Sequence, residues 1–436
     1  MVSESSAQES FVPRPAGSTM LAAVSAWPLL AGMSLLMVGN GLVVTLLGVR
    51  ASSEGFATLV TGIVMSGYFA GFFAGTWLTP RIIGRVGHVR VFAALASIAS
   101  VAVLVHSILV DPISWTAMRA LTGFSFAGLY IVAESWLNAT ASNHTRGRLL
   151  AVYMLTQYVG LAAGQALLGT ADPGGFALFI LSSIVVSIAV VPILLSAGVA
   201  PPFETPAPLS PRALFRVSPL GALGAISSGL TQGAFWSLGA VYVTALNLSV
   251  GWVAIFMTSV TLGGVILQWP VGHLSDAFGR RKVIVLVSVC GALACIAGGM
   301  VAERSTLGLI AAACVFGGMT LPLYSLSVAQ TNDYLDAKQM VAASSALVLF
   351  YGTGSIFGPL LASASMEVFG PNGFFWYLAL VTGWLGLFTL YRMTVRPEKP
   401  VGEQGPYVPV LARGSPLAAS AGQVEAPSSE TGDKTT

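Results

Sequence analysis

Long apolar stretches alternate with short polar ones along most of the chain. A helix that crosses a bilayer needs about 20 apolar residues, because each residue adds about 1.5 Å to a path about 30 Å long. No water reaches the backbone there, so each stretch must satisfy its own polar groups as a helix. The pattern predicts an all-α membrane protein with twelve transmembrane helices. We expect these helices near residues 22–47, 58–79, 89–110, 113–137, 147–170, 176–198, 219–246, 251–273, 282–302, 305–330, 340–362 and 372–392.

Composition excludes an ordinary soluble domain. Hydrophobic residues make up 55% of the 436 residues and charged residues 8%, whereas soluble domains carry about 25% charged residues. Too little polar surface would remain to cover a water-soluble fold of this size. We therefore expect the lipid bilayer as the surrounding medium. We expect no nucleic-acid partner, and the net charge of +3 is too small to indicate one.

The sequence gives no sign of an enzyme, a metal site or a cofactor site. Cys290, Cys295 and Cys314 lie in apolar runs and are predicted to be buried thiols. The four histidines are not grouped as metal ligands. The sequence contains no H-E-x-x-H, no G-x-S-x-G and no nucleotide-binding loop. We expect neither an enzyme nor a primary pump.

Polar segments divide the chain into five parts. We expect a cytoplasmic N-terminal segment at 1–21, a six-helix bundle at 22–198 and a second six-helix bundle at 218–392. The Pro-rich residues 199–217 are predicted to be a cytoplasmic linker between the bundles. Residues 393–436, rich in Pro, Gly, Ser and Glu, are predicted to be a disordered cytoplasmic tail.

Basic residues are distributed unevenly between the two sides of the predicted helices. If the N-terminus is cytoplasmic, the outer loops hold only Arg50 and Arg304 as basic residues. Apart from Arg119, which lies within a predicted helix, the inner segments hold the others, among them Arg81, Arg85 and Arg90, Arg146 and Arg148, Arg212 and Arg216, and Arg280 to Lys282. Cytoplasmic loops are enriched in Lys and Arg. We therefore place both termini on the cytoplasmic side of the plasma (inner) membrane.

The two halves of the chain repeat each other at an offset of roughly 190–195 residues. Gly87 and Gly279 each sit in a short basic loop after the second helix of a half. Gly160 and Gly164 correspond in the same way to Gly354 and Gly358. Two six-helix repeats are a common plan for secondary transporters, whose substrate site lies between them near the bilayer midplane. The repeat predicts two pseudo-symmetric bundles.

The loop after the eighth helix resembles a signature of the major facilitator superfamily, G-x-x-x-D-R/K-x-G-R/K-R/K. The segment "GHLSDAFGRRK", Gly272 to Lys282, matches it except that Ala277 replaces the first basic residue. The first copy, "PRIIGRVGHVR", is degenerate, because Pro80 stands at the opening Gly and Gly84 at the Asp. Its remaining signature residues are Arg85, Gly87 and Arg90.

Other segments extend the resemblance to about residues 22–392. The R-x-x-x-G motif of the family's fourth helix appears as Arg119 to Gly123. The segments "ESWLN" (134–138), "RGRLLAVYM" (146–154), "LQWPVGHLSDAFGR" (267–280) and "GSIFGPLL" (354–361) are similar to the YcaD-type bacterial branch. The resemblance implies the major facilitator fold and a transporter that works by alternating access.

Two charges inside predicted helices are the candidates for ion coupling. Arg119 lies in the fourth helix, where a charge costs several kcal/mol unless it faces a partner or water. The resemblance implies a role for it in proton coupling, and the alternative is an arginine that only holds helices together. Glu134 is either a protonatable coupling group or a gate residue bonded to Arg85 or Arg90. It lies 15 positions after Arg119, about 22 Å along the helix, so the two cannot pair.

The signature loops are the predicted gate. In the intact copy, Asp276 is expected to accept hydrogen bonds from the N-terminus of the fifth helix, near Gly147, because the helix dipole favours an anion there. The alternative is a plain positive-inside loop. The gate residues are Arg85, Gly87, Arg90, Gly272, Asp276, Gly279, Arg280 and Arg281.

Polar and aromatic residues in helices one, four, seven and ten are the cavity candidates, because the resemblance implies that these helices line the cavity. They are Asn40, Tyr130, Gln232, Trp236 and Tyr324, and Gln157 and Gln165 form a second polar set in the fifth helix. Gln232 and Trp236 are four residues apart and share a helix face. Each candidate is equally explained as an interhelical hydrogen bond.

The predicted function is secondary active transport of a small solute by a monomer, with protons as the coupling ion. Two alternatives stay open: a facilitator without ion coupling, and a sensor or scaffold that keeps a transporter fold but does not transport. The fifth-helix segment "GLAAGQALLG" has Gln165 where many antiporters of the family have Pro. The direction of transport therefore stays open.

Overall fold

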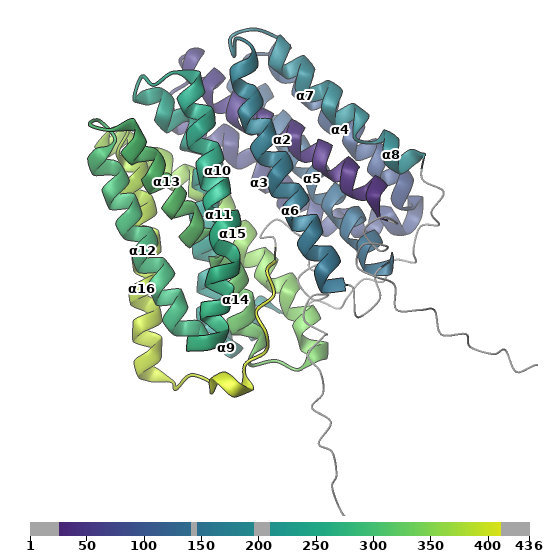
Figure 1. The fold of residues 1–436 in the computed structure, drawn as a ribbon. Helices are drawn as coiled ribbons and strands as arrows, with labels where there is room; N and C mark the ends of the chain where they lie inside the picture. Colours follow the sequence, from purple (N-terminus) through teal and green to yellow (C-terminus); the bar gives the residue numbers. More distant parts are fainter. Residues whose placement is uncertain (1–25, 141–145, 196–209, 411–436) are drawn as a thin grey trace, which may run out of the picture.

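The computed structural model describes residues 26–140, 146–195 and 210–410. The predicted N-terminal segment at 1–21, most of the linker and residues 411–436 lie outside the described residues. The described chain is built from helices and connecting turns (Figure 1).

The helices fall into an N-terminal and a C-terminal set. The N-terminal set consists of α2 (Trp27–Ser53), α3 (Thr58–Val86), α4 (His88–Ile108), α5 (Pro112–Thr140), α6 (Arg146–Ala166), η1 (Leu167–Thr170), α7 (Ala177–Ile188) and α8 (Val191–Leu194). The C-terminal set consists of α9 (Pro211–Val217), α10 (Pro219–Ala245), α11 (Val250–Phe278), α12 (Arg280–Val301), α13 (Thr306–Thr320), α14 (Leu323–Asn332), α15 (Ala337–Phe369), α16 (Gly373–Val395) and η2 (Val401–Glu403).

The predicted number of membrane helices is confirmed. Eleven helical spans of the described chain are long and apolar enough to cross a bilayer, and α10 with the short α9, bent by 117°, makes a twelfth. The sixth span is interrupted between α7 and α8, and the tenth between α13 and α14. Pro322 precedes α14, and a proline inside a helix removes one backbone hydrogen bond and clashes with the preceding turn.

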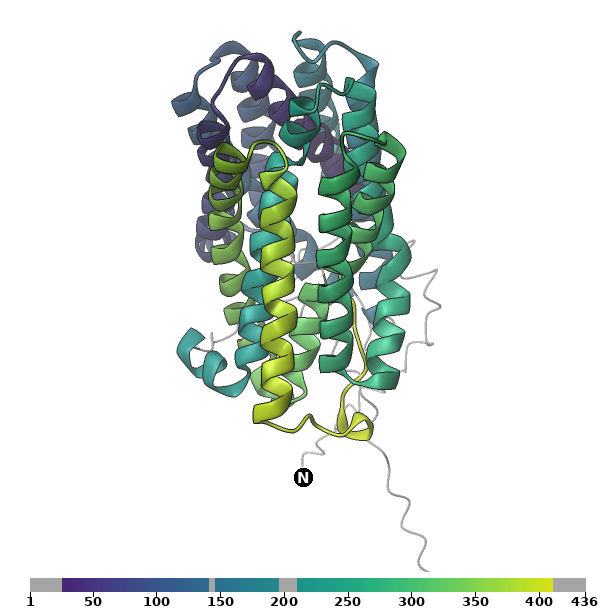
Figure 2. The ribbon, with the colours of Figure 1, turned by 90° about the vertical axis from the view of Figure 1, so that its left-hand side faces the viewer.

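The spans form two bundles that lie side by side (Figures 1 and 2). α2 to α8 form the N-terminal bundle, and α10 to α16 form the C-terminal bundle. Each has the same turn after its second span, where Gly87 and Gly279 adopt φ values of 90° and 96°. Glycine takes these values readily because it has no Cβ. The structure thus repeats the correspondence seen in the sequence.

The second repeated feature is a close contact between the first and fifth spans of each bundle. A Cβ at Gly164 of α6 would overlap the backbone of Val38 in α2, and one at Gly358 of α15 would overlap the backbone of Leu230 in α10. Small residues allow membrane helices to approach to backbone contact. These glycines therefore set the same helix pairing in both halves.

The two bundles meet at one end and diverge toward the other (Figure 1). We call the end where α3 and α11 finish the basic end, because it carries Arg81, Arg85, Arg280 and Arg281. Hydrogen bonds between the bundles lie toward the opposite end. They run from Leu59 N to Glu367 Oε1 (3.2 Å), from Ser66 Oγ to Ile356 O (2.9 Å) and from Thr261 Oγ1 to Gln165 Oε1 (3.2 Å).

The C-terminal residues differ from the predicted disordered tail. α16 continues to Val395, and residues 396–410 fold back along the basic end through η2. They end at Val410, which is only 6% exposed. Composition predicted disorder here, whereas the contacts that order the segment are made largely by its backbone atoms, which no composition reveals. Residues 411–436 lie outside the described part of the chain.

Candidate functional site

Arg119 is buried in the N-terminal bundle under an aromatic ring. It is 2% exposed, and its Cζ atom lies 4.5 Å from the centroid of the Tyr68 ring. A cation over an aromatic face is stabilised by the ring quadrupole, and more so away from water. One turn later, Gly123 lets α5 approach the Tyr68 backbone of α3 so closely that a Cβ would overlap it. Gly123, the glycine of the R-x-x-x-G motif, therefore allows the Tyr68 ring to pack against Arg119.

Glu134 is fully buried in the same helix, nearer the basic end. It is 0% exposed and accepts a hydrogen bond from the hydroxyl of Tyr153 in α6, at 3.4 Å. Tyr153 also interacts with Gln157 by a hydrogen bond, so the carboxylate, the phenol and the amide form one buried polar group. Arg85 and Arg90 are exposed. A buried carboxyl group of this kind is what the coupling interpretation of Glu134 calls for.

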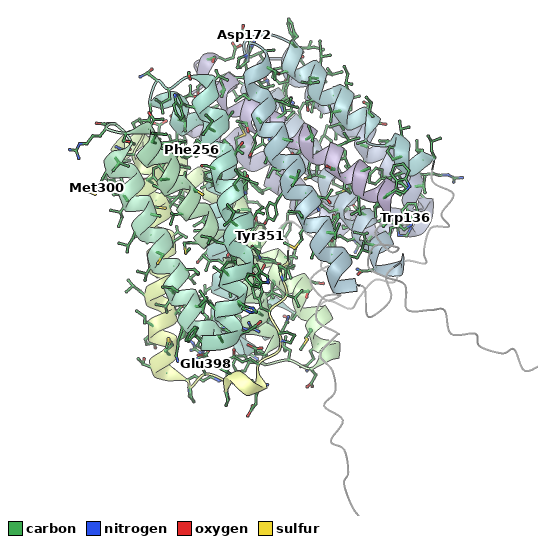
Figure 3. All side chains as sticks on the ribbon, in the orientation of Figure 1. Trp136, Asp172, Phe256, Met300, Tyr351 and Glu398 are labelled. Atoms are coloured by element: carbon green, nitrogen blue, oxygen red, sulfur yellow. The ribbon has the colours of Figure 1, made fainter. Side chains whose placement is uncertain are left out.

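The C-terminal bundle holds an aromatic and amide cluster. Tyr351 of α15 donates a hydrogen bond to Oε1 of Gln232 in α10, at 3.2 Å. Its ring packs edge-on to Tyr324 of α14, with centroids 5.2 Å apart. Figure 3 places Tyr351 near the boundary between the bundles. Tyr351 was not among the predicted cavity residues, because it lies in the eleventh helix and the candidates came from helices one, four, five, seven and ten.

The clusters of the two bundles are electrostatically linked. Tyr324 lies within electrostatic range of the Glu134 carboxylate. The structure thereby relates two predicted residues that are 190 positions apart in the sequence.

The other predicted cavity residues are buried within their own bundles. Tyr130 donates a hydrogen bond to Sδ of Met37 at 3.1 Å. Trp236 is 5% exposed and packs edge-on to Phe235, with ring centroids 5.1 Å apart. Asn40 is 2% exposed within α2. The Tyr130 contact joins α5 to α2, whereas the Trp236 ring contact lies within α10.

The intact gate loop forms a charged network at the basic end. Arg280 Nη1 lies 2.7 Å from Asp276 Oδ1 and donates to Ser275 Oγ at 2.8 Å. Arg280 Nε lies 3.4 Å from Oδ2 of Asp333, which follows α14. Burial raises the pKa of the Asp333 carboxyl above its usual range, and the Arg280 guanidinium opposes this shift.

Asp333 is a site residue that the sequence analysis missed. It follows the tenth span directly, on the side where the basic loops were placed. The sequence did contain a signal for this site, because Asp333 is an acidic residue among basic loops. The Arg281 guanidinium has different partners: it donates to the carbonyls of Arg392 and Arg396 and to the hydroxyl of Tyr334, the last at 2.9 Å.

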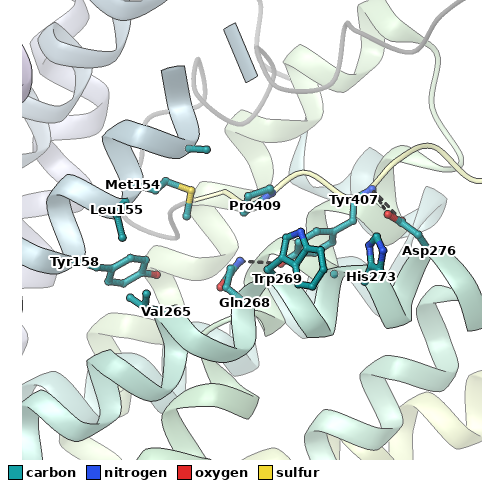
Figure 4. A pocket seen from close by; sticks show the side chains of 12 residues that line it. Met154, Leu155, Tyr158, Val265, Gln268, Trp269, His273, Asp276, Tyr407 and Pro409 are labelled. Carbon is teal, nitrogen blue, oxygen red and sulfur yellow. Dashed lines mark hydrogen bonds between the residues drawn. The ribbon is translucent and has the colours of Figure 1, made fainter. Parts of the chain in front are cut away.

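A cavity of about 300 Å³ lies between α6 and α11, next to this network (Figure 4). Met154, Leu155 and Tyr158 line it from α6, Gln268 and Trp269 from α11, and Tyr407 and Pro409 from the C-terminal segment. Two gate residues, Gly272 and Asp276, also line it, and none of the predicted cavity residues does. The cavity belongs to the gate at the basic end.

Asp276 was predicted to accept hydrogen bonds from the N-terminus of the fifth helix, but its described hydrogen bonds have other donors. Both oxygens accept from the backbone N–H of Tyr407, at 2.9 and 3.2 Å. In the first loop, Arg85 and Arg90 are exposed. The adjacent His88 is buried with Nε2 3.1 Å from Ser135 Oγ.

Among the described residues, no group of three or more His, Cys, Asp or Glu side chains is placed to hold a metal ion.

Comparisons with known proteins point to one family. The profile of the Major Facilitator Superfamily matches residues 221–422. The chain is 29% identical over 378 residues to the uncharacterized MFS-type transporter YcaD of Escherichia coli O139:H28 (strain E24377A / ETEC), covering 86% of this chain and 97% of that protein. The YcaD protein of Shigella flexneri matches with the same identity and coverage.

Solved structures share the fold at low sequence identity. The nucleoside transporter NupG superposes with a TM-score of 0.71 at 14% identity, covering 86% of this chain and all of NupG. A bacterial homologue of the human lysosomal transporter Spinster, inward-facing and occupied, gives 0.69 at 14% identity and covers 89% of this chain and 99% of that one. The family profile, the relatives and the shared fold thus make the chain similar to membrane transporters of the major facilitator superfamily, and among them to the YcaD-type proteins.

Proposed function

We propose that the chain is a secondary active transporter that moves a small solute across the bacterial inner membrane by alternating access, coupled to protons. The observation that carries the proposal is the unequal contact between the bundles. Hydrogen bonds join them toward one end, while a cavity lies between α6 and α11 at the other. One closed and one open end is the arrangement of a single state in alternating access.

The basic end is proposed to face the cytoplasm. Arginine and lysine are enriched in cytoplasmic loops, and Arg81, Arg85, Arg280 and Arg281 lie at this end, against Arg50 and Arg304 at the other. The state described here is then inward-facing, with both chain termini in the cytoplasm. We propose that the monomer is the working unit, because each bundle contributes half of one pathway.

Arg119 and Glu134 are the proposed coupling residues. Both are buried charged residues in one membrane helix, and such residues mark ion and substrate pathways. Glu134 contacts Tyr153 and interacts with Tyr324 of the other bundle. A change in its protonation would therefore alter the field at the boundary that must rearrange during transport. Arg119 would hold a fixed positive charge on the same pathway.

The solute is proposed to be small and partly apolar, and able to stack on aromatic rings and bond to amides. Tyr324, Tyr351 and Gln232 supply such groups in the C-terminal bundle, and Arg119 would favour a negative charge on the solute. The solved relatives include a nucleoside transporter and a D-xylose–proton symporter. Nucleosides, sugars and small carboxylates form the first panel to test.

The test is a flux assay with the purified full-length protein in liposomes, with and without a pH gradient. Gradient-driven accumulation of one panel member is the expected result. Arg119→Ala and Glu134→Gln should each reduce accumulation at least tenfold, and Arg119→Lys should retain part of it. Arg304→Ala removes an exposed arginine and should have no effect.

Two outcomes would redirect the assignment. Flux that equilibrates but never follows the pH gradient would indicate a facilitator without ion coupling. No flux and no thermal stabilisation by any solute of a wide panel would favour a sensor or scaffold on this fold. Accumulation that survives Arg119→Ala would contradict the coupling role of Arg119.

A further inference from the structure

The C-terminal residues 396–410, which we call the C-terminal strap, run back into the region between the bundles. The strap leaves α16 at the basic end, turns through η2 and rises toward the cavity between α6 and α11 (Figures 1 and 2). Tyr407 and Pro409 form part of the lining of that cavity, opposite Met154 of α6 (Figure 4). The strap therefore lies where the two bundles would have to approach to close this end.

The first part of the strap is fixed to the start of α12 and the end of α14. Glu398 Oε1 accepts from the backbone N–H of Arg281 at 2.8 Å, and the Arg281 guanidinium donates to the carbonyl of Arg396. Lys399 Nζ donates to the carbonyl of Asp333 at 3.0 Å. These contacts all lie within the C-terminal bundle.

The second part of the strap binds the charged side chains of the gate. Gly405 N donates to Asp333 Oδ1 at 3.1 Å, and Arg280 donates to the Gly405 carbonyl. Tyr407 N donates to both carboxylate oxygens of Asp276. The Tyr407 ring lies against Gly272, where a Cβ would overlap it. Gly272 and Asp276, the opening glycine and the acidic residue of the signature loop, thus both contact Tyr407.

The last part of the strap is anchored by a backbone pair and an apolar side chain. Ser325 Oγ bonds both the N–H and the carbonyl of Val410, each at 3.0 Å. The Val410 side chain joins a buried cluster with Tyr324, Leu347 and Tyr351. Tyr324 and Tyr351 belong to the proposed solute site, so the strap reaches from the gate to that site.

These contacts bear directly on gating. Closing the basic end would bring the N-terminal half of α6 toward α11, across the cavity that Tyr407 and Pro409 line. It would also free Asp276 to cap the N-terminus of α6, as helix N-termini favour a carboxylate. The strap forms one wall of this space and occupies this acceptor, so a bound strap opposes closure of the basic end.

We propose that the C-terminal strap is an autoinhibitory element, which binds the gate loop and the edge of the solute site and holds the transporter open at the basic end. The proposal rests on the proposed function, because it assumes a second state closed at this end. A segment that binds one state shifts the equilibrium only by its differential affinity for the two states. Release of the strap is then a step of each transport cycle, or a point at which transport is regulated.

The test measures the opening of the basic end in the full-length chain. Spin labels are attached at Ile82→Cys in α3 and Ala277→Cys in α11, both exposed positions at the basic end, after Cys290, Cys295 and Cys314 are replaced by alanine. Electron–electron distance measurements in nanodiscs then give the populations of open and closed states. Flux is measured on the same preparations in liposomes.

The decisive variant is Val410→Asp, which places a carboxylate in the apolar cluster and should expel the end of the strap. Its matched control is Val401→Asp, the same change at a 43% exposed position of the same segment. We expect Val410→Asp to raise the closed-to-open ratio on the order of tenfold, because several hydrogen bonds are lost together, and to increase flux. Val401→Asp should match the parent protein.

A second pair of variants guards against a folding defect in Val410→Asp. Deletion of residues 404–436 removes the gate-binding part of the strap, and deletion of 412–436 leaves it in place. We expect only the first deletion to shift the distances, with both proteins monodisperse. Tyr407→Pro, which lacks the N–H that Asp276 accepts, should shift them in the same direction.

The outcomes separate this inference from the proposed function. Unchanged distances in Val410→Asp and in the 404–436 deletion would overturn the strap proposal, even if solute flux is found. Shifted distances without any flux in any variant would uphold the strap as a conformational lock and contradict transport. Shifted distances with lower flux would overturn the inhibitory role and assign the strap a supporting one.

Discussion

Arg280 and Asp333 form a buried ion pair at the basic end, with Nε and Oδ2 3.4 Å apart and side chains 1% and 4% exposed. Arg280 also meets Asp276, but that carboxylate is 39% exposed and keeps access to water. Asp333 has less access to water. The pair therefore links the signature loop to the end of α14, at the place where the C-terminal strap crosses both.

Removing the cation should destabilise the fold strongly. Arg280→Met leaves the Asp333 carboxylate buried without its guanidinium, and breaking a buried pair costs about 3 kcal/mol or more. We expect this loss of unfolding free energy at pH 7, measured by thermal and denaturant unfolding in detergent. Lys282→Met removes an exposed cation two residues away and should change stability by less than about 0.5 kcal/mol. Equal effects of the two substitutions would show that the ion pair contributes nothing.

The Asp333 carboxyl should impose a measurable pH dependence on stability. Its pKa is raised in the folded protein by burial, so the folded state holds the proton more tightly than the unfolded state does. The stability that this proton contributes is complete below the unfolded pKa of about 3.9 and is lost as pH rises through the raised folded pKa. The wild-type melting temperature, relative to that of Asp333→Asn, should therefore fall as pH increases from about 4.

A matched measurement assigns that slope to Asp333. Arg280 lowers the pKa of this carboxyl against the effect of burial, so Arg280→Met should extend the same decline to higher pH. Glu403→Gln, at an exposed residue of η2, should reproduce the wild-type profile. Parallel profiles for wild type and Asp333→Asn would contradict the assignment.

The membrane helices were predictable because their signal is long and one-dimensional. The first helix was expected at 22–47 and is observed at Trp27–Ser53, and the turn glycines Gly87 and Gly279 were matched correctly as a repeat. Apolar stretches of about 20 residues leave few alternatives in a bilayer. The break at Pro322 was not predicted, because the apolar run continues through it.

The gate network could be predicted only in part. Asp276, Arg280 and Arg281 were found because they stand at fixed spacing in one loop. Their partners Asp333, Gly405 and Tyr407 lie 53 or more positions away from Arg280, and two of them act through backbone atoms. A backbone N–H is present in almost every residue, so no residue type identifies it. Such contacts become visible only when the chain is folded.

The contact between Gly123 and the Tyr68 backbone should be sensitive to a single methyl group. Gly123→Ala places a Cβ on the Tyr68 carbonyl, so α3 and α5 must separate and the Tyr68 ring must move relative to Arg119. Overpacking of this kind costs about 1–3 kcal/mol. We expect a lower melting temperature together with reduced gradient-driven flux.

The control for this substitution lies in the same helix as Tyr68. A Cβ at Gly84 meets nothing within 4 Å, and alanine is the better helix former by about 1 kcal/mol. Gly84→Ala should leave stability unchanged or increase it slightly, with normal flux. If Gly123→Ala melts at the same temperature as Gly84→Ala, the close approach of α3 and α5 is not required.

The hydrogen bond between Thr261 and Gln165 should set part of the balance between transport states. It joins α11 to α6 across the two bundles at 3.2 Å, and it must break when the end opposite the basic end opens. A net hydrogen bond contributes about 1 kcal/mol, or roughly a fivefold change in an equilibrium. Thr261→Val should therefore raise the population open at that end about fivefold, whereas Thr353→Val, which removes a bond within an exposed turn of α15, should not. Spin labels at the exposed Phe176 and Ser249 report the distance, and an unchanged distribution in Thr261→Val would mean that this bond is made equally in both states.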